Sequence, residues 1–275
     1  MSISKKYNQI KPKVKNFFRK KPFLSLDDFK GGSECLIAGP FLGEFGWDLM
    51  QWQGYIRQLS EFYKDLLDPD FKSKFAIYHQ RYSTNTFPTW SLAQPFRVIA
   101  HNGEINTLKG NKNWMAAHEP RLSHSNFEDS INDLKPIIDE DASDSAALDS
   151  TIELLIRSNR SLPMAKLLTI PEAWAHRRDF QKKLKDLYAY ANAVMEPWDG
   201  PAAICGAHDK WAIAGMDRNG LRPIRYTLTS EYLIAGSETG MVVLPEDQIV
   251  EKGRVGPGQM IAINFTEKKF YSDVE

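Results

Sequence analysis

The spacing of apolar residues along the chain predicts a series of short β-strands. Strands are indicated where apolar and polar positions alternate, or where a short apolar run is bounded by turn-forming residues. The predicted strands cover residues 35–42, 75–81, 96–100, 202–207, 211–216, 232–235 and 260–263. The first lies within a glycine-rich stretch, so we expect a buried strand followed by a turn.

Apolar residues that recur every three or four positions predict helices between these strands. The predicted helices cover residues 48–66, 113–122, 144–156 and 180–194. The third begins at Ser143-Asp144, which is a helix N-cap signature. Helices and strands do not alternate regularly as they do in βαβ units, so the predicted fold class is α+β.

Composition narrows the class of protein without identifying it. The 275 residues are 42% hydrophobic and 25% charged, which is typical of globular chains and not of disordered ones. Basic and acidic residues number 35 each, so net charge gives no reason to expect nucleic acid as a partner. No apolar run approaches the roughly 20 residues that span a bilayer, so no integral membrane segment is expected. Two cysteines, Cys35 and Cys205, cannot form a disulfide framework, which favours a reducing, cytoplasmic location.

Charge is distributed unevenly along the chain. Residues 1–22 form a basic tail with eight basic and no acidic residues, which leaves 27 basic and 35 acidic residues elsewhere, a net charge of −8. Apolar residues at roughly helical spacing would let this tail lie on an anionic surface. The alternative is a solvated, partly helical tail.

Polar residues near the ends of predicted elements supply the candidate chemistry. Arg81 suits bidentate binding of a carboxylate, although the pattern also fits a strand end with a surface ion pair. Asn102 and Gly103 could donate an amide and a backbone N–H to a developing oxyanion, although Asn-Gly is also a common hairpin turn. Asp144 could bind an ammonium group or only cap its helix. Cys205 lies in an apolar strand, where an inert core thiol is expected.

Together these motifs resemble one family closely. Residues 61–275 resemble the glutaminase domain of glutamate synthase large subunits, which are class II glutamine amidotransferases. The resemblance rests on His79-Gln-Arg-Tyr-Ser-Thr-Asn-Thr-Phe-Pro-Thr-Trp90, His101-Asn-Gly-Glu-Ile-Asn-Thr-Leu108, Ser143-Asp-Ser-Ala146, Glu196-Pro-Trp-Asp-Gly-Pro-Ala202 and Asp217-Arg-Asn-Gly-Leu-Arg-Pro223.

The resemblance implies an N-terminal-nucleophile fold, a four-layer αββα sandwich with two antiparallel sheets between helical layers. It also implies hydrolysis of glutamine to glutamate and ammonia for glutamate biosynthesis. In such a reaction a cysteine thiolate attacks the side-chain amide, and water cleaves the resulting thioester. Asn102 and Gly103 would stabilise the oxyanion, Arg81 would hold the α-carboxylate of glutamine, and Asp144 would hold its α-ammonium group.

The first section of the family's domain, which opens with Cys-Gly, is not found. Residues 23–60 do not resemble the family and stay unassigned, so the domain is expected to be incomplete at its N-terminal strands. Cys35 is a candidate nucleophile only if the chain is cleaved between Glu34 and Cys35, and Leu36 rather than glycine follows it. The alternative function is therefore an inactive truncated or fused remnant that at most binds glutamine.

The resemblance also sets the expected cofactors and partners. The flavin and iron–sulfur regions of the family are not found in this chain, and two cysteines cannot hold such a cluster, so no cofactor is expected. Glutamine is the expected ligand, and a separate synthase chain would have to use the ammonia.

Overall fold

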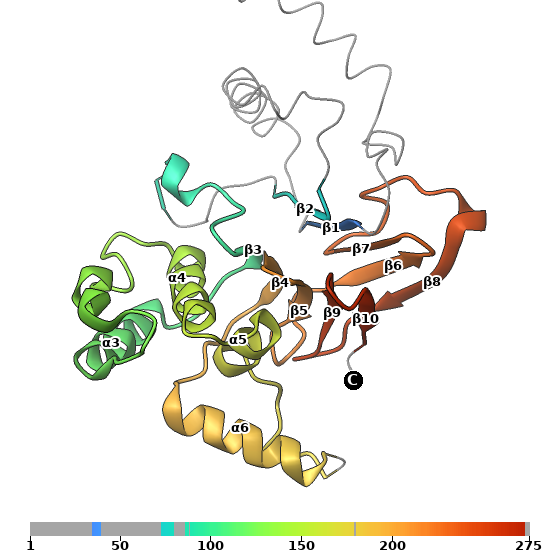
Figure 1. Ribbon diagram of the computed structural model, residues 1–275. Coiled ribbons are helices and arrows are strands. Elements are labelled where there is room, and N and C mark those ends of the chain that lie inside the picture. Colours follow the sequence, from blue (N-terminus) through green and yellow to red (C-terminus); the bar gives the residue numbers. More distant parts are fainter. Residues whose placement is uncertain (1–34, 40–72, 80–85, 88, 179, 273–275) are drawn as a thin grey trace, which may run out of the picture.

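Two five-stranded sheets form the centre of the molecule in a computed structural model, which describes residues 35–39, 73–79, 86–87, 89–178 and 180–272 (Figure 1). One, here called the β4 sheet, has the strand order β10-β9-β5-β4-β3. Its strands are β3 (Ile99–Gly103), β4 (Ala202–His208), β5 (Trp211–Met216), β9 (Met260–Asn264) and β10 (Lys269–Tyr271). The other, the β7 sheet, has the order β2-β1-β7-β6-β8. Its strands are β1 (Cys35–Gly39), β2 (Phe75–Ile77), β6 (Arg225–Thr229), β7 (Tyr232–Gly236) and β8 (Ile249–Arg254).

Helices of the described residues lie on the outer side of the β4 sheet (Figure 1). They are α3 (Leu108–His118), α4 (Asp144–Arg157), α5 (Leu162–Thr169) and α6 (Lys182–Val194). Helix α4 contacts β3, whereas α5 contacts β4 and β5. The α+β class is therefore confirmed, and the described residues supply three layers: helices, the β4 sheet and the β7 sheet. The second helical layer of the expected sandwich, and the helix predicted over residues 48–66, are not among the described residues.

The sequence of β4 explains this layering. Successive side chains of a strand point to opposite faces of its sheet. Ile204 therefore packs between the sheet and the helices, in a core that includes Ile152 of α4. Its neighbour Cys205 packs between the two sheets, in a core that includes Leu233 of β7. A strand that is apolar on both faces is required at the centre of a sandwich, and β4 has that composition.

Local signals placed several elements correctly. The Ser143-Asp144 prediction is confirmed, because Ser143 is the N-cap of α4 and its Oγ accepts a hydrogen bond from the backbone N–H of Ala146 at 3.1 Å. Helix α3 begins five residues earlier than predicted, and α5 was not predicted. Strands β6, β8 and β10 were also not predicted.

The expectation of purely antiparallel sheets is wrong for β1. Every strand pair of the β4 sheet is antiparallel, but β1 is parallel to both of its neighbours, β2 and β7. A parallel pair needs a crossover of roughly a dozen residues or more, and the chain between β1 and β2 is long enough for one.

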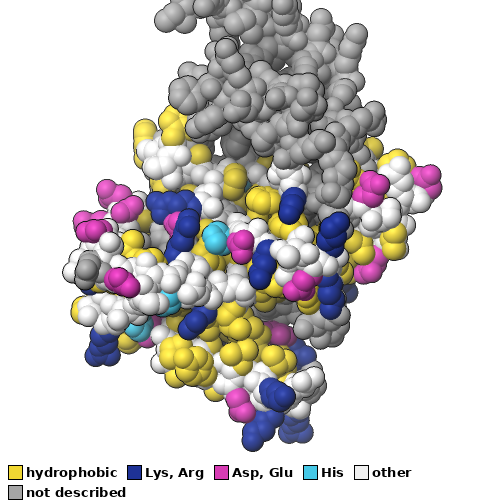
Figure 2. Space-filling model, viewed as in Figure 1, with side chains coloured by type: hydrophobic (Ala, Val, Ile, Leu, Met, Phe, Trp, Pro, Cys, Tyr) yellow, Lys and Arg dark blue, Asp and Glu magenta, His cyan; other side chains and the backbone are white. Residues whose placement is uncertain are grey.

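The surface gives two further observations. On the face shown in Figure 2, Lys and Arg side chains are interspersed with Asp and Glu side chains over the described residues. In the part of the chain that the structure describes, no helix has the length and apolar character needed to cross a bilayer.

Candidate active site

The candidate oxyanion donors lie at an edge of the β4 sheet that is open as far as the described residues go. Among the described strands, β3 is the last of this sheet and its one partner is β4. Hydrogen bonds from Glu104 N to Pro201 O (2.9 Å) and from Ala207 N to Val98 O (3.0 Å) fix which residues of β3 face β4. Hydrogen-bonded and non-hydrogen-bonded pairs alternate along an antiparallel ladder, so the N–H of Gly103 points away from β4, toward the open edge.

Most backbone N–H groups along this edge already donate a hydrogen bond. Three of them donate to a buried side chain from elsewhere in the fold: Ile99 to Asp149 Oδ1 (2.9 Å), His101 to Gln94 Oε1 (2.6 Å) and Ile105 to Asp144 Oδ2 (2.7 Å). For the N–H of Gly103, the hydrogen bonds of the described residues include no such acceptor. Among the described residues, this donor is therefore the one along the β3 edge that has no acceptor and can serve a ligand.

Gly103 is required at its position for steric reasons. Its φ of +155° is disfavoured for residues with a side chain, and a Cβ atom there would lie 1.8 Å from the carbonyl oxygen of Pro201. The hairpin-turn interpretation of Asn102-Gly103 is wrong, because both residues belong to β3 and pair with Ala203 and Ala202. The glycine lets the Pro201 carbonyl approach the strand and bond to Glu104.

The side chain of Asn102 points to the other sheet. Its Nδ2 donates to the Oγ of Ser237 at 3.4 Å, a long hydrogen bond, and Ser237 directly follows β7. The amide of Asn102 therefore lies between the two sheets, while the N–H of Gly103 lies in the plane of its own sheet. Adjacent residues at the end of one strand thus carry a side-chain amide donor and a backbone donor, the two kinds of donor that stabilise an oxyanion when both reach it.

Asp144 lies beside these donors. It is the first residue of α4 and is 8% exposed, and its bond to Ile105 attaches it two residues beyond Gly103. Its other oxygen, Oδ1, accepts the hydroxyl of Ser145 at 3.1 Å. A carboxylate offers about four acceptor positions, so about two remain. The capping role falls to Ser143, which leaves Asp144 able to accept donors from a ligand.

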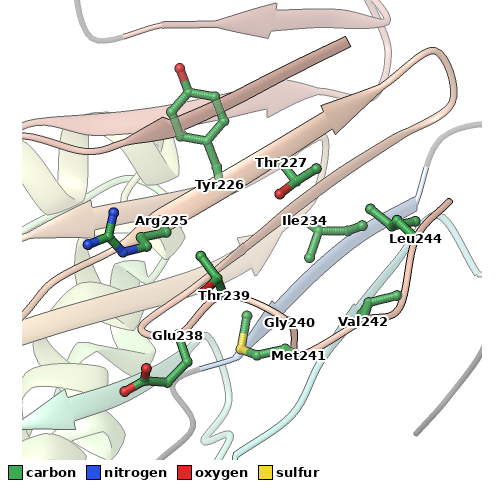
Figure 3. A pocket seen from close by; sticks show the side chains of 10 residues that line it. All are labelled: Arg225, Tyr226, Thr227, Ile234, Glu238, Thr239, Gly240, Met241, Val242 and Leu244. Atoms are coloured by element: carbon green, nitrogen blue, oxygen red, sulfur yellow. The ribbon is translucent and has the colours of Figure 1, made fainter. Parts of the chain in front are cut away.

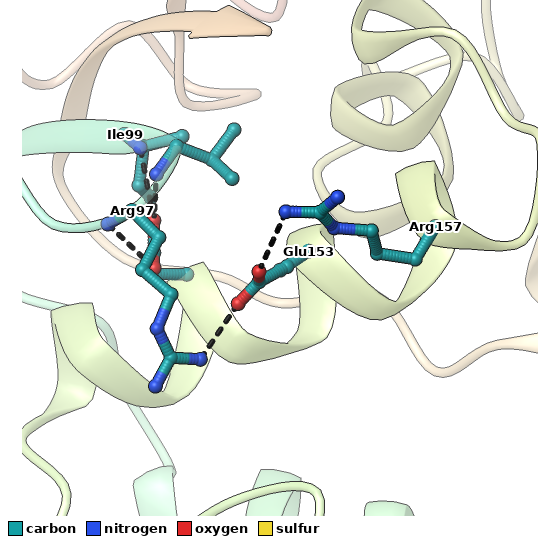
Figure 4. Close-up of polar contacts among 6 residues, drawn as sticks. Arg97, Ile99, Glu153 and Arg157 are labelled. Carbon is teal, nitrogen blue, oxygen red and sulfur yellow. Dashed lines mark hydrogen bonds and ion pairs between the residues drawn. The ribbon is translucent and has the colours of Figure 1, made fainter. Parts of the chain in front are cut away.

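Asp149, which the sequence analysis did not single out, fixes the start of β3. Its carboxylate accepts three backbone N–H groups, those of Arg97 (3.2 Å), Val98 (3.0 Å) and Ile99 (2.9 Å) (Figure 4). Burial raises the pKa of Asp149 to about 6, while these donors act in the opposite direction. An aspartate within the apolar stripe of a predicted helix was the signal that could have identified it.

Asp217 fixes the strand segment opposite Gly103. It is 1% exposed, and its carboxylate accepts four backbone N–H groups: Ala202 (3.0 Å), Asn219 (3.0 Å), Leu221 (3.0 Å) and Arg222 (3.3 Å). Ala202 is the partner of Gly103 in the ladder. The motif at residues 217–223 therefore folds around its own aspartate and supports the site through β4.

Arg81, the candidate carboxylate ligand, lies outside the described residues. His79, two residues earlier, lies against β3, and its Nε2 donates to the carbonyl oxygen of His101 at 3.0 Å. His79 and Gln94 are both buried and both bind the backbone of His101. His79 belongs to one of the motifs that carry the family resemblance, but neither residue was predicted as a site residue from the sequence.

Of the two cysteines, Cys205 is an inert core thiol, as predicted. It is 2% exposed, and burial raises its pKa to about 12, so almost no thiolate forms near neutral pH.

The register of β1 determines where Cys35 lies along its strand. Gly39 pairs with Gly236, the residue before Ser237, so the Gly39 end of β1 is the end nearest Asn102. Cys35 pairs with Tyr232, four residues back along the strand. At roughly 3.3 Å per residue this is about 13 Å from the Gly39 end. The backbone of Cys35 is thus not brought together with Asn102, Gly103 and Asp144.

A small cavity lies between β6, β7 and residues 238–244. Its volume is about 20 Å³, and Arg225, Glu238 and Met241 are among its lining residues (Figure 3). This is room for about one water molecule. The cavity is therefore too small to be a glutamine site.

Comparisons with known proteins agree on one family. The family model of the class-II glutamine amidotransferases matches residues 52–275. The large chain of NADPH-dependent glutamate synthase from Azospirillum brasilense is 56% identical over 219 residues, which are 79% of this chain and 14% of that relative. Ferredoxin-dependent glutamate synthase 2 from Synechocystis is 47% identical over 231 residues, which are 82% of this chain and 15% of that relative. The chain thus spans about one seventh of the length of these relatives.

Among solved structures, the glutamine phosphoribosylpyrophosphate amidotransferase of B. subtilis aligns with 70% of this chain and 34% of that chain. The TM-score is 0.38 and the sequence identity 20%.

Proposed function

Because this chain belongs to the class II glutamine amidotransferases, we propose that residues 61–275 form a glutaminase domain that binds glutamine and hydrolyses its side-chain amide. The observation that carries the proposal is the N–H of Gly103. It points to the open edge of the sheet, while the neighbouring edge donors are held by Gln94 and Asp144. A backbone donor that has no acceptor among the described residues, next to an amide side chain, can stabilise a tetrahedral oxyanion.

The proposed reaction passes through a covalent intermediate. A thiolate attacks the amide carbon of glutamine, and the carbonyl oxygen becomes an oxyanion that accepts hydrogen bonds from Gly103 N and Asn102 Nδ2. The carbon–nitrogen bond then breaks, and ammonia leaves after its nitrogen gains a proton. Water cleaves the thioester, which releases glutamate and restores the thiol. These steps require no cofactor.

The α-substituents of glutamine would be held by opposite charges. We assign the α-ammonium group to Asp144, which has acceptor capacity left, and the α-carboxylate to Arg81. We further propose that the ammonia is used by a synthase part, as the names of the relatives suggest, in a reducing, cytoplasmic compartment.

A second candidate function is glutamine binding without hydrolysis. The register of β1 favours it, because the Cys35 end of that strand is the end away from Asn102. Oxyanion donors and an ammonium ligand suffice to bind glutamine, but a thioester needs a thiolate within bonding reach of the amide carbon.

Glutamate release by the purified chain separates the two functions. Wild type, Cys35→Ala and Cys205→Ala would be compared, with Cys205→Ala as the control for loss of a thiol that lies away from the edge donors. Hydrolysis that is lost only in Cys35→Ala would support the glutaminase function with Cys35 as nucleophile. Calorimetric binding of glutamine without hydrolysis in all three proteins would support binding alone. Absence of both binding and hydrolysis would contradict the proposal.

A further inference from the structure

A chain of polar contacts connects Asp144 to the carbonyl of Pro201, which lies against Gly103. The His101 ring lies in the middle of this chain and is 2% exposed. Its Nδ1 is 2.7 Å from the Oγ of Ser145, which in turn donates to Asp144 Oδ1 at 3.1 Å. Its Nε2 is 3.4 Å from the carbonyl oxygen of Pro201. None of these side-chain contacts is needed to hold the backbone of His101, which Gln94 and His79 already bind.

The number of protons in this chain is too small to satisfy every contact. Ser145 has one hydroxyl proton, which can go either to Asp144 or to Nδ1 of His101. The carbonyl of Pro201 can only accept. The pKa of His101 is lowered, mainly by burial; Asp144, the contact with Pro201 and Asp217 act in the opposite direction, and Arg222 lowers it further. The ring is therefore neutral near pH 7 and carries one proton, on Nδ1 or on Nε2.

Without a ligand, the charge on Asp144 decides the arrangement. A hydrogen bond to a carboxylate is stronger than one to a neutral ring nitrogen, so Ser145 donates to Asp144. Nδ1 of His101 must then carry the proton and donate to Ser145. Nε2 is left without a proton and faces the lone pairs of the Pro201 carbonyl.

A cationic ligand at Asp144 reverses this preference. We propose that binding of an α-ammonium group to Asp144 switches the tautomer of His101, so that its proton moves from Nδ1 to Nε2 and hydrogen-bonds to Pro201. The cation compensates the charge of Asp144 and so weakens its attraction for the Ser145 hydroxyl, which turns to donate to Nδ1. Protons are conserved, because one leaves the ring at Nδ1 and one joins it at Nε2 through exchange with solvent.

The switch connects recognition of the amino group to the oxyanion donor. Pro201 O is the atom that a Cβ at position 103 would meet at 1.8 Å, and it accepts the N–H of Glu104. A proton on Nε2 stabilises this carbonyl in its place against Gly103. His101 is thus a positioning residue that acts through Pro201 and does not touch the reacting atoms. This inference rests on the proposed role of Asp144 in binding glutamine.

Nitrogen NMR of the ¹⁵N-histidine-labelled full chain tests the switch, because protonated and unprotonated ring nitrogens have well-separated shifts. The His101 signals are assigned by their loss in His101→Gln. We expect saturating L-glutamine to move the proton from Nδ1 to Nε2. Glutaramic acid, which is glutamine without its α-amino group, should leave the tautomer unchanged. The glutamate formed by any hydrolysis keeps the ammonium group and does not alter the expectation.

Variants of Ser145 provide an arm that needs no ligand. Ser145→Ala removes the acceptor for Nδ1 of His101, so in this variant the His101 ring should carry its proton on Nε2 already in the free protein. Ser145→Thr keeps a hydroxyl and should restore the proton on Nδ1. Calorimetry on the same samples separates the tautomer switch from the proposed binding of glutamine. Glutamine binding without a tautomer change overturns the switch alone. No glutamine binding overturns the proposed function and the switch with it.

Discussion

Asp144 and Asp149 are two buried carboxylates of the same helix, and each holds one end of the same strand. The two carboxylate oxygens of Asp149 accept hydrogen bonds from three backbone N–H groups at the start of β3. Asp144 binds the chain just beyond the end of β3, and from the described residues it accepts one backbone N–H group and one hydroxyl. The residue type, the helix and the burial are shared, so residue type alone does not separate a structural carboxylate from one that we propose to bind a ligand. The number of acceptor positions left over does.

We expect the greatest loss of stability when Asp149, the structural carboxylate, is replaced. Asp149→Ala leaves three N–H groups without this acceptor, of which those of Val98 and Ile99 are buried, and each buried group costs about 1–3 kcal/mol. We expect the free energy of unfolding to fall by about 4 kcal/mol, measured by urea denaturation. Asp149→Asn keeps an oxygen for Val98 and Ile99 and should lose less than half as much. A loss below about 1 kcal/mol in Asp149→Ala would contradict the role given to this carboxylate.

The next largest loss of stability is expected at Gly103, the last residue of β3. Gly103→Ala places a Cβ against the Pro201 carbonyl, so strand and turn must separate, and we expect a loss of about 3 kcal/mol in unfolding free energy. Gly240→Ala is a matched control, because its φ is +80° but no atom lies within 4 Å of the added Cβ. It should lose only the conformational cost of about 1 kcal/mol. Equal losses in the two variants would show that the close approach of Pro201 has no energetic consequence.

Lys166 is a third buried ionisable residue, and its contribution to stability depends on pH. Lys166 is 1% exposed, donates to the carbonyl of Gly258 at 2.8 Å, and has its pKa lowered to about 8 by burial. Between pH 8 and about 10.5 the unfolded chain binds more protons than the native one, so this group makes the protein more stable as the pH rises.

Substitution of Lys166 isolates this contribution. The difference in unfolding free energy between wild type and Lys166→Met should shift in favour of wild type by about 2 kcal/mol between pH 7 and pH 10. Denaturation at a series of pH values measures it. A difference that does not change with pH would mean that Lys166 titrates alike in both states.

The smallest effect is expected one turn beyond Asp149. Glu153 pairs with Arg97 and Arg157, whose side chains are 72% and 59% exposed (Figure 4). Exposed ion pairs contribute about 0–1 kcal/mol, so Glu153→Gln should change the unfolding free energy by less than about 1 kcal/mol. A larger loss would show that this surface network stabilises the start of β3 together with Asp149.

Local pattern and long-range contact explain which features the sequence could predict. Ser143 was predictable as a cap because its partner, Ala146, is three residues away. Asn102-Gly103 suggested a turn, because the strand that pairs with it lies about a hundred residues later. The parallel direction of β1 likewise depends on β7, far along the chain. The acceptor inventories of Asp144 and Asp149 require knowledge of which N–H groups reach them, and no spacing rule supplies that.

We propose that Asp144 keeps acceptor positions for an ammonium group, and the glutamine affinity of Asp144→Asn is the decisive measurement. The amide oxygen of Asn can still accept the N–H of Ile105, so the fold should persist while the charge is lost. Calorimetry should find glutamine affinity reduced by roughly 100-fold relative to wild type, whereas Asp149→Asn should bind glutamine within about threefold of wild type. Equal affinity of wild type and Asp144→Asn would contradict the account.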